Sequence, residues 1–258
     1  ELLDCLAERG IPFVPCTGRT WTGLPDELLS HPATRYAVTS DGAVVMEVDH
    51  GTGGHGAAAP RASRIYLSCM GKERVLALYE RLRGVECTFD VFWDGHVYVE
   101  RDRYELLGSF GIKPHDLSVI RRLRTPVDER TPDLLARLGG VERLSIYWGD
   151  PALADVIAGA VEEDRSLHHT CSSTQNLEVM DAGTSKGVAL TWLCAHLGIP
   201  VEESVGFGDS PNDLSMIEAV GDGVAMANAF EEVKMAADHV TDVDNDHGGV
   251  MRYLKGVL

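Results

Sequence analysis

The feature that most constrains the fold is a regular alternation of helix and strand patterns toward the carboxyl end of the chain. Three helical segments, at 186–197, 211–220 and 230–237, are separated by short apolar strands at 204–207 and 224–227. Helices that alternate with strands predict a parallel sheet, because each helix returns the chain to the same edge of the sheet. We therefore expect a doubly wound, Rossmann-like parallel sheet in an α/β core.

The first fifty residues have the same α/β character. An opening helical pattern ends at Gly10, a good helix-terminating residue, and the apolar segment 11–16 is predicted to be a buried strand. Two short strands follow at 36–38 and 43–48, with a turn at Asp41–Gly42 between them. We therefore assign this segment and the carboxyl-terminal one to a single domain.

The middle of the chain is set apart by a change in composition. Residues 51–62 are rich in Gly and Ala and lack periodicity, which is typical of a linker or loop. Beyond them a second α/β pattern begins with a strand at 65–69. The simplest arrangement is a discontinuous core domain, residues 1–60 and 181–258, interrupted by an inserted α/β cap domain at 61–180.

Charge and cysteine usage exclude several kinds of partner. The 258 residues include 23 Lys and Arg against 40 Asp and Glu, and the formal net charge of −17 repels nucleic acids and anionic membranes. No apolar run reaches the ~18 residues of a membrane-spanning helix. The six cysteines show no paired spacing. We expect a cytoplasmic protein with no nucleic-acid or membrane partner, and its oligomeric state stays open.

The most informative segment runs from the end of a strand into the following helix. Ser210 is a natural helix N-cap, Pro211 suits the first helical position, and Asp213 completes a capping box. Asp209 is not needed for capping, and it stands at the carboxyl end of the strand, where open α/β sheets bind ligands. Two carboxylates and the amide of Asn212 offer oxygen ligands suited to Mg²⁺. The alternative is an acidic helix start with no ligand.

Lys186 is a second candidate. It follows two potential N-caps, Thr184 and Ser185, so its ammonium lies at the positive end of the helix dipole, which is unfavourable unless an anion is near. A phosphoryl group would supply that anion, because helix N-termini already bind phosphate through their free amides. The alternative is a solvated surface lysine. On the dipole argument, Lys186→Ala is expected to leave stability unchanged or slightly higher.

A third candidate is the turn Thr17–Gly18–Arg19 at the end of the predicted strand 11–16. It combines a hydroxyl, a small residue that lets a ligand approach the backbone closely, and a guanidinium. Such a turn is weak evidence alone. Its value is that all three candidates lie at strand ends or helix starts of the same predicted sheet.

Taken in order, these segments resemble the haloacid dehalogenase superfamily, and in particular its Cof-like phosphatases. The resemblance is carried by Thr-Gly-Arg at 17–19, Thr-Ser-Lys-Gly at 184–187, Gly-Asp-Ser-Pro-Asn-Asp at 208–213 and Ala-Met-Ala-Asn at 225–228. It implies Mg²⁺-dependent hydrolysis of phosphate monoesters of small metabolites, such as sugar phosphates, through an aspartyl-phosphate intermediate. The cap is expected to close over the site and select the substrate.

The resemblance also assigns each candidate residue a role. Some residues would bind and neutralise the transferring phosphoryl group, and others would form a metal shell beside it. The implied residues are catalytic Lys186, Thr17 and Arg19; substrate-binding Thr17, Gly18, Lys186 and Asn228; and metal-binding Asp209, Asn212 and Asp213.

One motif of that family is not among these 258 residues: the Asp-x-Asp-Gly-Thr sequence that supplies its nucleophile and its general acid and base. We expect this motif ahead of the opening helix, within about 20 to 40 further residues. If the native protein lacks this motif, the favoured alternative is a phosphate-binding module that does not catalyse. A sugar-phosphate phosphatase or phosphosugar mutase of a related branch is a further alternative.

Other acidic and histidine-rich segments are weaker candidates. The run 242–246 fails as an EF-hand because His247 and Tyr253 occupy key positions, and a solvated loop explains it better than a transplanted nucleophile. His168 and His169 are adjacent in a predicted strand, so they point to opposite faces and do not chelate a metal together. Around a predicted hairpin turn, Trp93, Asp94 and His96 either contact the substrate or form a turn with a packed indole.

Overall fold

The computed structural model of the protein describes residues 1–50 and 61–257. These residues divide into two compact units. The first unit comprises Glu1–Gly18, Leu24–Tyr66 and Thr184–Leu258, and the second comprises Arg19–Gly23 and Leu67–Gly183. Both units mix helices and strands, in agreement with the predicted α/β class.

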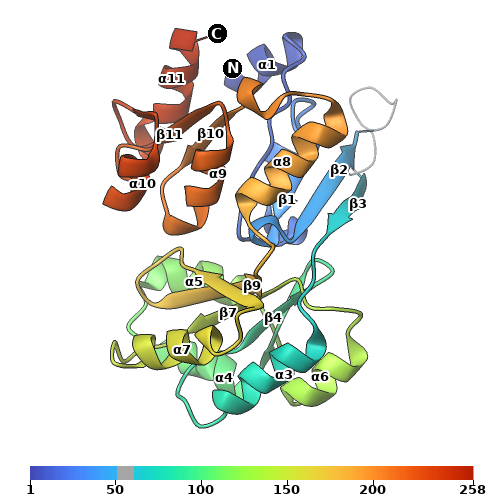
Figure 1. The fold of residues 1–258 in the computed structure, drawn as a ribbon, viewed down its shortest axis with the longest axis vertical. Coiled ribbons are helices and arrows are strands. Elements are labelled where there is room, and N and C mark those ends of the chain that lie inside the picture. The colour runs from blue at the N-terminus through green and yellow to red at the C-terminus, as the bar shows by residue number, and fades with distance from the viewer. Residues whose placement is uncertain (51–60, 258) are drawn as a thin grey trace. The chain divides into compact units, whose positions relative to one another are not determined.

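One sheet of the first unit contains β1 (Tyr36–Thr39), β2 (Val44–Asp49) and β3 (Arg61–Leu67) in that order, with β1 and β2 antiparallel. Helix α8 (Lys186–Leu197) lies against this sheet (Figure 1). Its buried residues Ala189 and Leu193 pack with apolar side chains of β1 and β2. This packing fixes the start of α8 relative to the loop between β1 and β2. Short helices α1 (Leu2–Glu8) and α2 (Asp26–Leu29) precede the sheet.

The second sheet of this unit is parallel throughout, as the alternation of helix and strand predicts. It contains β10 (Val205–Gly208), β11 (Asp222–Ala225) and β12 (His239–Val240). The helices that alternate with or follow these strands are α9 (Leu214–Ala219), α10 (Glu231–Ala236) and α11 (Gly249–Val257) (Figure 1). The carboxyl end of β10 leads directly into the turn that precedes α9. In open sheets of parallel strands, ligands bind at the carboxyl ends of the strands.

The predicted strand at 11–16 is wrong in detail. The segment is extended, and the backbone groups of Pro15 and Thr17 form hydrogen bonds with Val38 of β1. Within the segment, only Cys16 forms a bridge of the parallel type, with Val38. Pro12 and Pro15 explain this outcome, because neither has an N–H to donate to a continuous ladder. The segment nevertheless delivers the chain to Thr17 at the end of β1.

The segment after the predicted linker also differs from expectation. The linker at 51–62 lies mostly outside the described residues, and its last two residues begin β3. The strand predicted at 65–69 is the end of β3, which joins the sheet of β1 and β2 in place of a sheet in the second unit. Helix α5 (Pro114–Arg122), which begins at a proline in a favourable first position, was not predicted.

The second unit is built on a six-stranded sheet with strand order β6-β5-β4-β7-β9-β8. All neighbours are antiparallel except β5 and β6. Its core lies where apolar residues of the sheet meet α3, α6 and α7. The elements are α3 (Lys72–Arg81), β4 (Asp90–Trp93), β5 (His96–Glu100), α4 (Arg101–Leu106), α5, β6 (Thr125–Val127), α6 (Thr131–Arg137), β7 (Arg143–Tyr147), α7 (Leu153–Glu162), β8 (Leu167–Thr170) and β9 (Asn176–Asp181).

The hairpin of β4 and β5 forms where the sequence predicts it. Asp94 and Gly95 both have positive φ angles, 50° and 80°, which the two-residue turn requires. The indole of Trp93 packs so closely on Gly139 and Gly140 that a Cβ at either glycine would lie within 2.6 Å of it. This contact favours the packed-turn interpretation of Trp93. Among the described residues, no helix is long and apolar enough to cross a membrane.

Candidate active site

Lys186 occupies the first position of α8, and it is not the solvated lysine of the alternative interpretation. Ser185 is the N-cap and its side chain accepts a hydrogen bond from the Val188 backbone N–H. The Lys186 side chain is 5% exposed, and its Nζ lies 2.6 Å from Asp213 Oδ1 and 3.8 Å from Asp41 Oδ1. Burial disfavours the charged ammonium, but the two carboxylates outweigh burial and raise the pKa of Lys186.

Asp213 links the start of α9 to Lys186. It completes the predicted capping box with Ser210, and Pro211 stands at the first helical position as expected. Its Oδ2 accepts the backbone N–H groups of Asp209 at 2.9 Å and Ser210 at 3.2 Å, while its Oδ1 accepts from Lys186. Both oxygens of Asp213 are therefore engaged by protein donors, which leaves Asp209 as the better source of a metal ligand.

Asp209 lies directly after β10 and is half-buried. Burial, together with the neighbouring negative charge of Asp213, raises the pKa of the Asp209 carboxyl. The Ser210 hydroxyl approaches Asp209 Oδ1 at 3.4 Å, a long and weak contact. The Asp209 carboxylate is thus partly shielded from solvent, and a nearby positive charge would stabilise its ionised form.

Asn212 contacts a residue that the sequence did not mark as functional. Its Nδ2 donates to Asp41 Oδ1 at 3.0 Å across 171 residues of chain. Asp41 is in the turn η2 (Ser40–Gly42) between β1 and β2, and it is 1% exposed. From the sequence, Asp41–Gly42 is an ordinary turn signal, because nothing local shows that its carboxylate is buried against α8 and η5 (Pro211–Asp213).

Thr17 and Gly18 reach the same region through the backbone. The Thr17 N–H donates to Val38 O at 2.9 Å, and the Thr17 carbonyl accepts the Asp41 N–H at 3.1 Å. The preceding residue, Cys16, is in an environment whose burial raises the pKa of its thiol to about 12, so the thiol is neutral. The first unit therefore brings together three of the sequence-predicted segments: Thr17–Gly18, Lys186 and the loop after β10.

Two predicted site residues have other surroundings. Arg19 is exposed and belongs to the second unit, so its catalytic role stays a prediction. Asn228 is exposed, and its Oδ1 accepts the backbone N–H of Asn245 at 3.2 Å. Asn228 thus anchors the acidic loop that follows β12, and its predicted contact with substrate also stays a prediction.

The acidic loop itself has a structural explanation. Asp244 is the N-cap of η6 (Asn245–His247), and its Oδ1 accepts the His247 backbone N–H at 3.0 Å. Asp242 and Asp246 are exposed. These features support the interpretation of the run 242–246 as a capped surface loop.

His168 and His169 are neighbours on β8, as predicted, and His169 Nε2 lies 3.4 Å from Glu162 Oε1.

The charges around Lys186 suit a divalent cation. Asp41, Asp209 and Asp213 carry three carboxylates against the single ammonium of Lys186. In the described part of the chain, no group of three or more His, Cys, Asp or Glu side chains forms a ready metal site. Hard divalent cations such as Mg²⁺ bind through one or two carboxylates, several waters and a substrate phosphate. Carboxylate and amide oxygens of this kind are the donors that a hard divalent cation accepts, and Asp209 is a candidate ligand.

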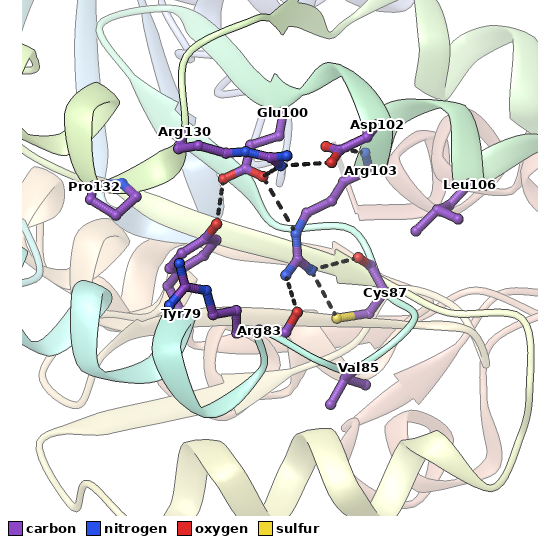
Figure 2. Close-up of a pocket in the computed structure, with 10 residues that line it drawn as sticks. All are labelled: Tyr79, Arg83, Val85, Cys87, Glu100, Asp102, Arg103, Leu106, Arg130 and Pro132. Atoms are coloured by element: carbon purple, nitrogen blue, oxygen red, sulfur yellow. Dashed lines mark hydrogen bonds and ion pairs between the residues drawn. The ribbon is translucent and has the colours of Figure 1, made fainter.

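A cavity of about 490 Å³ in the second unit contains a different cluster (Figure 2). At its centre the buried Glu100 accepts hydrogen bonds from Tyr79 Oη at 2.7 Å and Arg130 Nη1 at 2.7 Å. The guanidinium of Arg103 donates hydrogen bonds to the carbonyl oxygens of Cys87 and Leu82. These polar groups are paired with one another, and the cavity contains none of the predicted site residues. We interpret it as a structural network.

Comparison with known proteins decides the family. A family profile described as haloacid dehalogenase-like hydrolase matches residues 1–254. The chain belongs to the haloacid dehalogenase-like hydrolases. The resemblance found in the sequence, to this superfamily and its Cof-like branch, is confirmed.

Two curated phosphatases are similar to part of the chain. The chain is 45% identical over 97 residues to Phosphatase YwpJ of Bacillus subtilis (strain 168). It is 38% identical over 98 residues to 5-amino-6-(5-phospho-D-ribitylamino)uracil phosphatase YwtE of the same strain. Each match covers 38% of this chain and 34% of the relative, so it spans about a third of the relative's length.

A solved structure covers the whole chain. It is a haloacid dehalogenase-like hydrolase from B. subtilis, with a TM-score of 0.79 and 26% identity, and the match covers 100% of this chain and 91% of that chain. The shared fold includes both units described above. The family and the fold are therefore established.

Proposed function

We propose that this chain forms the phosphate-binding and metal-binding core of a Mg²⁺-dependent phosphatase that hydrolyses phosphate monoesters of small metabolites. The observation that carries the proposal is that contacts within the first unit link Lys186 to the backbone of Asp209 through Asp213, and to the Thr17–Gly18 turn through Asp41. A buried ammonium, a half-buried carboxylate and a hydroxyl-bearing turn are the groups that phosphoryl transfer requires, because that reaction depends mainly on positioning and charge stabilisation.

Each group has a defined part in this proposal. Lys186 places a fixed positive charge where negative charge builds up on the phosphoryl oxygens, and its raised pKa keeps it protonated at neutral pH. Thr17 and Gly18 donate hydrogen bonds to those oxygens, and Asp209 holds the metal. When bound, Mg²⁺ supplies Lewis-acid stabilisation of the transferring phosphoryl group. The proposal includes an aspartyl-phosphate intermediate and assigns its nucleophile to no residue of this chain.

The substrate class follows from the family and its members. One similar protein is named as a phosphatase of a phosphorylated ribitylaminouracil, a small metabolite. We extend the same class of substrate to this protein. We assign substrate selection to the second unit, which contains most of the predicted cap domain at 61–180. We also propose a cytoplasmic location, which the scattered spacing of the six cysteines in the sequence supports.

The test is turnover of phosphate monoesters by the whole protein. A panel of sugar phosphates, nucleotides and p-nitrophenyl phosphate is assayed with Mg²⁺ and with a chelator. We expect turnover that depends on Mg²⁺ and is abolished in Lys186→Met. Binding of inorganic phosphate without turnover of any monoester would instead identify a non-catalytic phosphate-binding module. Equal turnover with and without the metal would contradict the proposed chemistry.

A further inference from the structure

The turn between β1 and β2 has an unusual backbone. Ser40, Asp41 and Gly42 have successive φ angles of 50°, 52° and 94°, all in the left-handed region that non-glycine residues rarely adopt. All three residues are buried. A buried left-handed turn at this position persists only if its surroundings hold it, and such turns are concentrated at functional sites.

The turn is packed directly against the start of α8. A Cβ at Gly42 would lie 2.1 Å from the carbonyl oxygen of Ser185 and 2.9 Å from the backbone nitrogen of Lys186. Only glycine therefore fits between the turn and the helix. This close approach brings the Asp41 carboxylate to the N-terminus of α8, beside the Lys186 ammonium.

Asp41 joins three segments that are distant in the sequence. Its Oδ1 accepts from Asn212 Nδ2 at 3.0 Å and lies 3.8 Å from Lys186 Nζ. Its backbone N–H donates to the carbonyl of Thr17 at 3.1 Å. One residue thus contacts the helix that carries Lys186, the loop after β10 and the turn that carries the Thr17 hydroxyl.

We propose that Asp41 is a positioning residue that fixes the Lys186 ammonium and the Asn212 amide relative to each other. Because its Oδ1 takes the Nδ2 hydrogen of Asn212, the side-chain amide of Asn212 has a defined rotation, with its carbonyl oxygen directed elsewhere. Because the same oxygen lies near Lys186, the ammonium is held between Asp41 and Asp213. This inference rests on the proposed function and names a residue that the sequence motifs do not include.

The first experiment measures kinetics of the whole protein with p-nitrophenyl phosphate and saturating Mg²⁺. Asp41→Ala removes the charge and the hydrogen-bond acceptor, whereas Asp41→Asn is isosteric and retains an acceptor oxygen for Asn212. We expect kcat to fall about 100-fold in Asp41→Ala and about tenfold in Asp41→Asn, with KM within about twofold of wild type. Folded Asp41→Ala with wild-type kcat would overturn the inference.

A matched control separates positioning from general stability. Asp222, at the amino end of β11, also accepts two side-chain contacts, from His239 Nδ1 at 2.9 Å and Tyr253 Oη at 2.7 Å. Asp222→Asn removes a charge from a half-buried, hydrogen-bonded carboxylate in the same unit, at the other end of the parallel sheet from Asp209. We expect kcat of Asp222→Asn to stay within about twofold of wild type. An equal loss of kcat in both Asn variants would show that Asp41 has only a structural role.

A second readout does not depend on activity. The side-chain amide protons of Asn212, assigned by NMR with Asn212→Ser as reference, report its hydrogen bond directly. We expect one of the two protons to exchange slowly in the wild type and rapidly in Asp41→Ala. Fast exchange of both in the wild type would overturn the inference. Absence of phosphatase activity in the wild type would overturn the proposed function, and this measurement would still test Asp41.

Discussion

The Nζ of Lys186 lies 2.6 Å from Oδ1 of Asp213, and both side chains are at least 90% buried. The pair joins the first residue of α8 to the turn before α9, and Asp213 accepts two backbone N–H groups with its other oxygen. The Asp213 carboxylate is therefore one anion that offsets the unfavourable position of Lys186 at the positive end of the helix dipole. A bound phosphoryl group would add to an existing electrostatic arrangement.

Lys186→Ala is expected to destabilise the protein, which reverses the expectation drawn from the helix dipole alone. Removing one member of a buried ion pair leaves the carboxylates of Asp213 and Asp41 uncompensated, at a cost of about 3–5 kcal/mol. Urea unfolding at pH 7 measures the change. The matched control is Lys255→Ala, which breaks an exposed pair with Glu1 and is expected to change stability little. Similar losses in both variants would contradict a special role for the buried pair.

Asp209→Asn is expected to stabilise the metal-free protein at neutral pH. The raised pKa means that the folded state favours the protonated carboxyl more than the unfolded state does. Ionisation of Asp209 therefore lowers the free energy of unfolding, and this loss is complete once the pH is above the pKa of the folded state. Below the unfolded-state value of 3.8 that cost is absent, and the gain of the variant should disappear. Thermal unfolding in a chelator at several pH values measures this difference.

Addition of Mg²⁺ should make the wild type more stable than Asp209→Asn. The wild type gains stability by binding the metal, whereas Asp209→Asn loses a charged ligand and gains little. The variant should also lose at least about 100-fold in Mg²⁺-dependent turnover. Asp26→Asn, at an exposed acidic residue of α2, serves as the control and should respond to Mg²⁺ as the wild type does. Equal Mg²⁺ stabilisation of Asp209→Asn would remove Asp209 from the metal site.

Gly187→Ala tests the close approach of α8 and α9. A Cβ at Gly187 would lie 2.0 Å from the carbonyl oxygen of Ser215, so the helices must separate to accept a methyl group. We expect a loss of at least about 1–3 kcal/mol in urea unfolding. Gly159→Ala in α7 is the control, because nothing lies within 4 Å of the added Cβ, and it should stabilise by about 0.5–1 kcal/mol. Stabilisation of both variants would show that the helices are not in contact there.

The sequence predicts residues whose role is local and misses those whose role depends on packing. The capping box of Ser210 and Asp213 and the parallel strands follow from short patterns, and both form. The position of Asp41 beside Lys186 requires the antiparallel pairing of β1 and β2 and the packing of α8 on them, which no local pattern encodes. The broken ladder at 11–16 was foreseeable from its two prolines, whereas the burial of Lys186 was not.

The hydrogen-bond network of Glu100 in the second unit is expected to contribute to the pH dependence of unfolding (Figure 2). Burial alone would raise the pKa of Glu100, but hydrogen bonds from Tyr79, Thr131 and Arg130 outweigh it and lower the pKa below the ordinary value of 4.5. For a carboxyl with a lowered pKa, the stabilisation is complete above the unfolded-state value and is lost as the pH falls through the folded-state value.

Glu100→Gln should therefore be less stable than the wild type at pH 7 by about 1.5–3 kcal/mol, because its hydrogen bonds lose their charge-assisted character. The difference should shrink as the pH falls below 4.5, since protonation then removes the same charge from the wild type. Urea unfolding from pH 7 to pH 3.5 follows this change. The control is Glu163→Gln, which breaks an exposed pair with Arg81 and should show a small difference at every pH. If the Glu100→Gln difference were constant with pH, the Glu100 charge would not be the stabilising element.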